Sequence, residues 1–102
     1  MTIARFKDLC LDAGDPARLG EFWASVLGRE WERKDDGDGL VTGPTPGHAI
    51  WVNRVPEPRS VKNRVHLDIY ARELADLEAL GASVVERQRG WTVMADPEGG
   101  EF

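Results

Sequence analysis

Polar side chains that could do chemistry alternate with apolar ones in two similar stretches of the sequence. Residues 4–12 place Leu9 and Leu11 on one side of a predicted strand, and residues 64–70 repeat the alternation. The opposite sides of the two strands carry thiol, carboxylate, guanidinium and imidazole groups: Asp8, Cys10 and Asp12, then Arg64, His66 and Asp68. Such groups on one sheet face are typical of a site for a small molecule or a metal ion.

A third predicted strand, residues 48–54, adds an indole and an amide to this set, because Trp51 and Asn53 share one side of it. Trp91 begins a later strand and could line either a core or a pocket. The predicted substrate-binding residues are therefore Trp51, Asn53, His66, Asp8 and Trp91.

Purely structural roles would also explain several of these residues. A histidine in a strand is often a hydrogen-bonded structural residue, because imidazole has many roles besides metal binding. Asp12 and Asp68 end their strands, where carboxylates often accept from nearby backbone N–H groups. Cys10 fits a small buried side chain, since no neighbour marks it as a reactive thiol. Two tryptophans are expected in the core: Trp23 and Trp31.

The composition excludes several classes of protein. The 102 residues, of which 41% are apolar, suffice for one domain with a modest core. Thirteen basic and eighteen acidic side chains give a net charge of −5, so no basic face for nucleic acid is expected. A single cysteine forms no internal disulfide, and no apolar run approaches the ~20 residues that span a membrane. Met1–Arg5 lacks the apolar stretch of a signal peptide, which predicts a cytoplasmic protein.

The elements that must position these side chains can be predicted from helix-capping and turn residues and from the hydrophobic periodicity. Asp15 suits a helix N-cap, Pro16 the first helical position and Gly28 the residue after the helix. An amphipathic stripe lies between them: Leu19, Phe22, Trp23, Val26 and Leu27. Glycine- and proline-rich turns then separate predicted strands at 29–35, 39–43 and 48–54. Residues 55–60 contain two prolines and read as an extended connector.

The second half of the chain repeats this order of elements. A strand at 64–70 precedes a helix at about 72–80 and strands at 83–87 and 91–95. Asp96–Gly99 has the residues of a type I turn, after which Glu101 and Phe102 begin a final strand. The sequence thus predicts one domain, 1–102, made of two strand–helix–strand–strand–strand modules at about 4–55 and 62–102. Each module needs a partner to cover one face of its sheet.

Three segments of the chain resemble one family, the glyoxalase-like domains of the vicinal oxygen chelate superfamily. This superfamily includes glyoxalase I, bleomycin-resistance proteins and extradiol dioxygenases. The resemblance rests on residues 11–28 (LDAGDP through FW to LG), 54–68 (RVPEP through KNRVHLD) and 91–102 (WTVMADPEG with EF). It implies an α+β fold of two paired βαβββ modules, whose mixed sheets curl into an open cup with a truncated last strand. It also implies a homodimer.

The resemblance further implies positions for one divalent metal ion. Metal-dependent members of the family hold the ion with four side chains, typically two histidines and two glutamates. Carried over by motif, these positions fall on Asp8, Asn53 and His66, with the fourth just beyond Phe102. Only His66 keeps the usual residue type, and the neutral amide of Asn53 replaces an anion, which would weaken the site.

Three functions remain open at this stage. The first is a metal-dependent lyase, isomerase or dioxygenase, in which the ion would polarise substrate oxygens. The second is a metal-free protein that binds or sequesters a small molecule, like the bleomycin-resistance proteins. The third is an interaction module that uses its open sheet edge. Under the first two, a small-molecule ligand is the expected partner, whereas nucleic acid and membrane are not.

Overall fold

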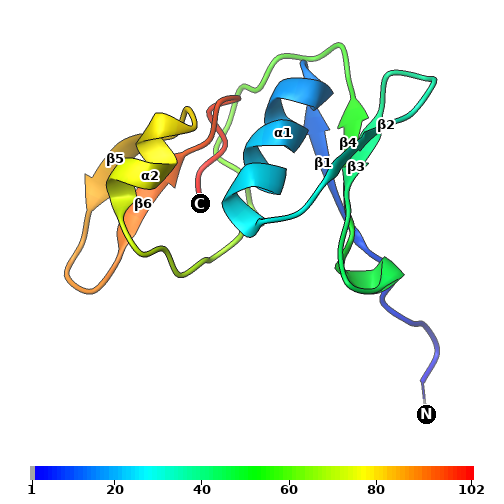
Figure 1. Cartoon of the computed structure of the whole chain (residues 1–102), viewed down its shortest axis with the longest axis horizontal. Coiled ribbons are helices and arrows are strands. Elements are labelled where there is room, and N and C mark those ends of the chain that lie inside the picture. Colours follow the sequence, from blue (N-terminus) through cyan, green and yellow to red (C-terminus); the bar gives the residue numbers. More distant parts are fainter. Residues whose placement is uncertain (1) are drawn as a thin grey trace.

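The computed structural model describes residues 2–102 as a mixed α+β protein with two unequal halves (Figure 1). The N-terminal half contains a four-stranded sheet and one helix, and the C-terminal half contains a two-stranded sheet and a short helix. The regular elements are β1 (Leu9–Ala13), α1 (Pro16–Leu27), β2 (Trp31–Arg33), β3 (Gly39–Val41), a 3₁₀ turn (Pro46–His48), β4 (Ile50–Arg54), α2 (Leu74–Ala79), β5 (Ser83–Arg87) and β6 (Thr92–Ala95).

The N-terminal sheet has the strand order β1-β4-β3-β2. β1 runs parallel to β4, with Leu9 opposite Ile50, and the other neighbouring strands are antiparallel. The helix α1 packs against this sheet, as its apolar stripe predicts. Its predicted ends are confirmed: the Asp15 carboxylate accepts from the Arg18 backbone N–H at 3.2 Å, and Gly28 adopts the left-handed conformation at φ 65°.

The predicted strands of this half are shorter in the structure. β1 begins at Leu9 rather than at residue 4, because residues before Leu9 lie beyond the register of β4. Similarly, β2 covers only the middle of the predicted 29–35, and β3 ends two residues before residue 43. The antiparallel ladder of β2 and β3 has only three residue pairs, so the flanking residues leave the sheet.

The C-terminal half is built around the β5-β6 hairpin. The two strands are antiparallel, with an irregularity between Val84 and Glu86. After the Asp96–Gly99 turn, Glu101 bridges to Ala95, and Phe102 exchanges two backbone hydrogen bonds with Met94 at 2.8 and 2.9 Å. The predicted start of a final strand at Glu101 is therefore seen as a short antiparallel pairing with β6.

The predicted strand at 64–70 is wrong for this structure, in which the segment has no strand. In the first module, the equivalent strand β1 is held by its parallel neighbour β4. Residues 64–70 make no backbone hydrogen bond within the described residues 2–102. Without a ladder partner the alternation does not form a strand, although Leu67 and Ile69 still pack against the core.

A single hydrophobic core joins the two halves. Residues from α1, β3 and β4 cluster with Leu77, Ala82 and Met94 from the second half. The Phe102 ring lies 5.0 Å from that of Trp23 and 5.9 Å from that of Phe22, between centroids. Trp23 is 1% exposed, as predicted for a core residue, whereas Trp31 is half-buried against the core. Neither helix of residues 2–102 is long and apolar enough to cross a bilayer.

Candidate functional site

The C-terminal half contains a cavity of about 610 Å³, called here the C-terminal cavity, between residues 62–74 and the β6 region. Its apolar wall is formed by Ile69, Leu74, Val93, Met94 and Phe102. Its polar lining is formed by Lys62, His66, Asp68, Thr92 and Glu101, and Tyr70 and Trp91 supply two further aromatic rings. An apolar cavity with a few polar groups and a volume of this order is typical of small-molecule sites.

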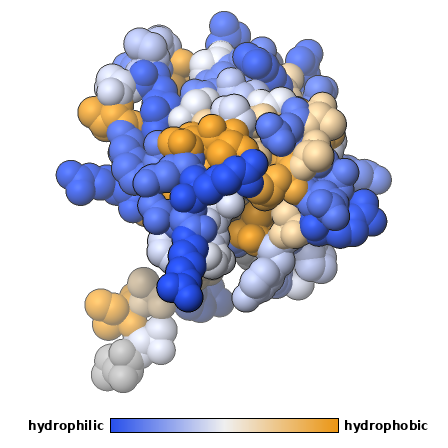
Figure 2. Space-filling model, turned by 90° about the vertical axis from the view of Figure 1, so that its left-hand side faces the viewer, coloured by the Kyte–Doolittle hydropathy of each residue, from blue (hydrophilic) through white to orange (hydrophobic). Residues whose placement is uncertain are grey.

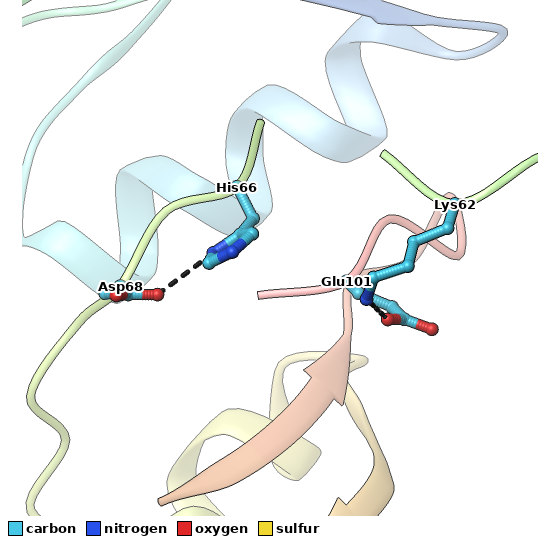
Figure 3. A network of polar contacts seen from close by, with 4 residues as sticks. All are labelled: Lys62, His66, Asp68 and Glu101. Carbon is cyan, nitrogen blue, oxygen red and sulfur yellow. Dashed lines mark hydrogen bonds and ion pairs between the residues drawn. The ribbon is translucent and has the colours of Figure 1, made fainter. Parts of the chain in front are cut away.

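Two pairs of polar side chains lie along this cavity, as Figure 3 shows. The His66 ring is turned toward Asp68, with 3.0 Å between Nδ1 and the carboxylate oxygen. The Lys62 ammonium donates to the Glu101 carboxylate. This hydrogen bond is the main cause that lowers the pKa of Glu101, and the charges of Lys62, Arg59 and His66 lower it further. Glu101 therefore stays ionised in the neutral range.

Two parts of the chain position these groups. Lys62, His66 and Asp68 belong to residues 55–73, the segment without a strand, whereas Glu101 is fixed by its bridge to Ala95 in β6. Figure 2 views the molecule from the side of β5, β6 and α2, and there an apolar area is bordered by hydrophilic side chains.

A second polar group lies on the N-terminal sheet and is called here the N-terminal cluster. The Lys7 ammonium bonds the Asp8 carboxylate at 2.8 Å, and the Cys10 thiol lies 3.5 Å from the same carboxylate. Cys10 and Trp51 are neighbours across β1 and β4, and the Lys34 ammonium lies 5.9 Å from the Trp51 ring centroid.

The electrostatics of this cluster follow from its contacts. The hydrogen bond from Lys7 is the main cause that lowers the pKa of Asp8. Burial and then the Asp8 carboxylate raise the pKa of the Cys10 thiol, so Cys10 is held in the thiol form. The Cys10 residue is exposed overall, which contradicts the prediction of a buried small side chain, since Cys10 alternates with Leu9 and Leu11 and lies on the face of β1 opposite the core.

A third feature lies between the halves. It is a cavity of about 530 Å³ that is lined by β1 and by residues 55–65. There the Glu98 carboxylate accepts from the Gly14 backbone N–H at 2.7 Å and ties the closing turn to the end of β1. The Asp96 carboxylate accepts from the backbone N–H groups of Glu98 and Gly100, each at 2.9 Å. Burial nevertheless raises the pKa of Asp96.

The predicted site residues divide between two places. His66 and Trp91 line the C-terminal cavity, whereas Asp8, Trp51 and Asn53 do not. These three residues belong instead to the N-terminal cluster, where Trp51 and Asn53 affect the pKa values of Asp8 and Cys10. The C-terminal cavity and the N-terminal cluster thus divide the five predicted residues between them, and a single cup-shaped site that holds all five stays a prediction.

A metal ion does not fit the donors as they are placed here. Asn53 lies in β4 and Asp8 directly precedes β1, whereas His66 lines the cavity of the other half, and a divalent ion needs its ligands within about 2.0–2.6 Å. The described residues 2–102 contain no group of three or more histidine, cysteine, aspartate or glutamate side chains that could hold a metal. The metal site remains a prediction from the resemblance, and we derive no chemical step through it.

Sequence reasoning missed Lys62, Tyr70, Glu101 and Phe102 as cavity residues. Lys62 lies between the connector at 55–60 and the predicted strand at 64–70, and Glu101 lies in a short pairing with β6, so neither belongs to a recognisable periodic pattern. The repeat offered one signal: Glu101 follows the turn that returns the chain toward 64–70. Its ion pair with Lys62 spans 39 residues and depends on tertiary structure.

Comparison with known proteins identifies the family. A family model for the glyoxalase-like domain matches residues 8–102, so the chain belongs to this family and to the vicinal oxygen chelate superfamily. The mixed α+β fold with an open sheet agrees with that assignment. No curated protein matches the sequence.

Solved structures share the fold at low sequence identity. A glyoxalase/bleomycin resistance protein/dioxygenase family enzyme from Burkholderia phytofirmans PsJN has a TM-score of 0.68 and 18% identity, over 97% of this chain and 95% of its own. A protein of similar description from Nocardioides has a TM-score of 0.67 and 18% identity, over 99% and 82%. A possible glyoxalase from Bacillus cereus has a TM-score of 0.65 and 13% identity, over 95% and 94%. Similarity at this level supports the fold and not a particular reaction.

Proposed function

We propose that the chain binds a small organic molecule in the C-terminal cavity and does so without a metal ion, as a binding or sequestering protein. The observation that carries this proposal is the cavity itself, in which an apolar wall faces two polar pairs. The names of two structural relatives include the words bleomycin resistance protein beside glyoxalase and dioxygenase, and the proposal takes the first of these for this chain.

The lining explains how such a ligand would be held. The apolar wall around Met94 and Phe102 would gain free energy from excluding water, at about 25 cal/mol per Å² of apolar area buried. Hydrogen bonds to Lys62 or to the Thr92 hydroxyl would orient the molecule. Nothing in this binding requires the N-terminal cluster.

The proposal is tested by narrowing the cavity. Ala71 lines it and is exposed, so Ala71→Trp would fill part of its volume with little effect on folding. Ala75 is also exposed and does not line the cavity, so Ala75→Trp is the matched control. A library of small organic molecules is first screened by thermal shift, and the compounds that stabilise the protein are then measured by calorimetry.

We expect Ala71→Trp to lose binding and Ala75→Trp to keep it. If no compound in the library stabilises the protein, or if both variants bind equally well, the proposed function is wrong. A compound whose binding disappears on treatment with EDTA would contradict the metal-free part of the proposal.

A further inference from the structure

We propose that the ligand of the C-terminal cavity is a flat, uncharged compound of two or three fused aromatic rings, stacked on Trp91 and covered by Tyr70. This inference rests on the proposed function, since it names the class of molecule that would occupy the same site. Three independent features of the cavity support it: its exposed rings, its paired charges and its volume.

The first feature is the exposure of two aromatic side chains along one cavity. Trp91 is 63% exposed and Tyr70 is fully exposed, yet both line the C-terminal cavity. Aromatic rings stabilise proteins mainly when they are buried or stacked. The aromatic contacts within residues 2–102 join Phe22, Trp23 and Phe102, so Trp91 and Tyr70 leave their faces open to a ligand.

Trp91 and Tyr70 also differ in how firmly the backbone holds them, and therefore in how far each can move toward a ligand. Trp91 lies just before β6, whose residues Thr92 and Met94 are half-buried and buried, so its backbone is anchored. Tyr70 lies in the segment without a strand, and no backbone hydrogen bond of residues 64–70 occurs within the described chain. Trp91 therefore suits a fixed platform, and Tyr70 suits a side chain that closes over the ligand.

The second feature is that the charged groups along the cavity are already paired. Lys62 is bonded to Glu101, and His66 to Asp68. A charged ligand would enter without a free counter-ion and would place its charge against the apolar wall, which carries a desolvation penalty. An uncharged ligand with one hydroxyl or carbonyl group can instead share the remaining N–H groups of Lys62 or the Thr92 hydroxyl.

The third feature is size. The cavity volume of about 610 Å³ lies in the middle of the range for drug-sized ligands. Two or three fused rings occupy part of such a volume and present a flat face to both aromatic side chains. A single ring would occupy a smaller part of this volume.

The test uses four probes with one carbon skeleton: 2-naphthol, its saturated analogue decahydro-2-naphthol, 2-naphthoate and 2-naphthylmethylammonium. We expect calorimetry at neutral pH to give the tightest binding for 2-naphthol. Loss of planarity or gain of either charge should weaken binding by about tenfold or more, as expected when an aromatic contact or an ion's hydration is lost.

Variants identify the side chains responsible. Trp91→Ala and Tyr70→Ala should each weaken 2-naphthol binding by about tenfold, the effect of one lost aromatic pair. Tyr70→Phe keeps the ring and should bind as the unchanged protein does. Phe6→Ala is the matched control, because Phe6 is 79% exposed and lines neither cavity.

The outcomes separate this inference from the proposed function. If decahydro-2-naphthol binds as tightly as 2-naphthol, or if Tyr70→Ala and Phe6→Ala behave alike, the stacking inference is wrong. Binding that still disappears in Ala71→Trp would then leave the proposed function standing. If 2-naphthoate or the ammonium probe binds tightest, the inference of an uncharged ligand is wrong.

Discussion

The sequence predicts one order of elements for the two halves of this protein, but in the structure the halves differ in regularity. The first half forms a four-stranded sheet whose first strand, β1, is held by β4. In the second half the equivalent stretch, residues 64–70, has no strand, and α2 has 6 residues where α1 has 12. Similar alternation thus leads to different structure, because a strand exists only where a neighbour completes its hydrogen bonds.

The two halves also differ in the kind of polar site that each contains. The regular half holds its polar side chains in a compact cluster around Asp8, whereas the irregular half has the cavity with paired charges and open aromatic rings. Segments with few backbone hydrogen bonds are the ones that most readily adapt to a ligand. The predictions below test whether the two halves also differ in amide protection, in core packing and in helix capping.

The largest expected effect is in hydrogen exchange. Amides of β4, which is paired on both sides, should exchange about a thousandfold more slowly than those of residues 64–70, because their opening requires the sheet to separate. Exchange measured by NMR or mass spectrometry checks this. Equal protection of the two stretches would show that residues 64–70 are paired in solution and would remove the contrast.

The second prediction concerns the core that joins the halves. Trp23→Ala should lower the free energy of unfolding by roughly 3–5 kcal/mol, because a fully buried indole and its contacts with Phe22 and Phe102 are lost. Trp91→Ala removes an exposed indole and should change it by less than about 1 kcal/mol. Urea denaturation checks both values.

A matched variant sharpens this second test. The Trp23 indole N–H is buried and has no hydrogen-bond partner within residues 2–102. Trp23→Phe removes this unsatisfied donor and keeps a ring, so it should be less destabilising than Trp23→Ala. Separate unfolding transitions for the two halves, instead of one, would contradict the shared core.

The third prediction compares the starts of the two helices. The Asp15 side chain caps α1, whereas Glu73, at the same position before α2, makes no side-chain cap bond. Asp15→Ala should therefore lower the free energy of unfolding by about 1 kcal/mol, and Glu73→Ala should leave it nearly unchanged. Thermal unfolding monitored by circular dichroism would reveal the opposite order if the two caps were misassigned.

The smallest expected effect concerns the Asp96–Gly99 turn after β6. Burial raises the pKa of the Asp96 carboxyl, so the folded state favours its protonated form. The stability that protonation contributes is present below the unfolded pKa and is lost as the pH rises through the folded pKa. Asp96→Asn keeps an oxygen that can accept from Glu98 and Gly100 and removes the buried charge.

We therefore expect Asp96→Asn to raise the urea midpoint slightly at neutral pH and to flatten its pH dependence on the acidic side. Asp35→Asn is the control, since Asp35 is an exposed carboxylate in the β2–β3 turn. A neutral-pH midpoint that falls in Asp96→Asn would mean that the ionised carboxylate is needed by its neighbours.

Much of the fold could be predicted from the sequence, and little of the site. The helix α1 was predicted at both ends, because capping by Asp15 and the left-handed Gly28 are local effects. Periodicity also predicted the β5-β6 hairpin and the pairing that begins at Glu101. The convergence of Asp8, Asn53 and His66 stays a prediction, whereas the cavity that His66 lines together with Lys62 and Glu101 was not predicted.

The sequence by itself therefore determined the family, the α+β class and the ends of α1, since these depend on spacing, composition and nearest neighbours along the chain. The second helix, α2, is shorter than the predicted 72–80. Only the tertiary structure decided that residues 64–70 do not join a sheet and that His66 and Trp91 share a cavity. The reason is that strand pairing and ion pairs such as Lys62–Glu101 join residues far apart in the chain. Alternation cannot specify the partner that makes a strand or a site.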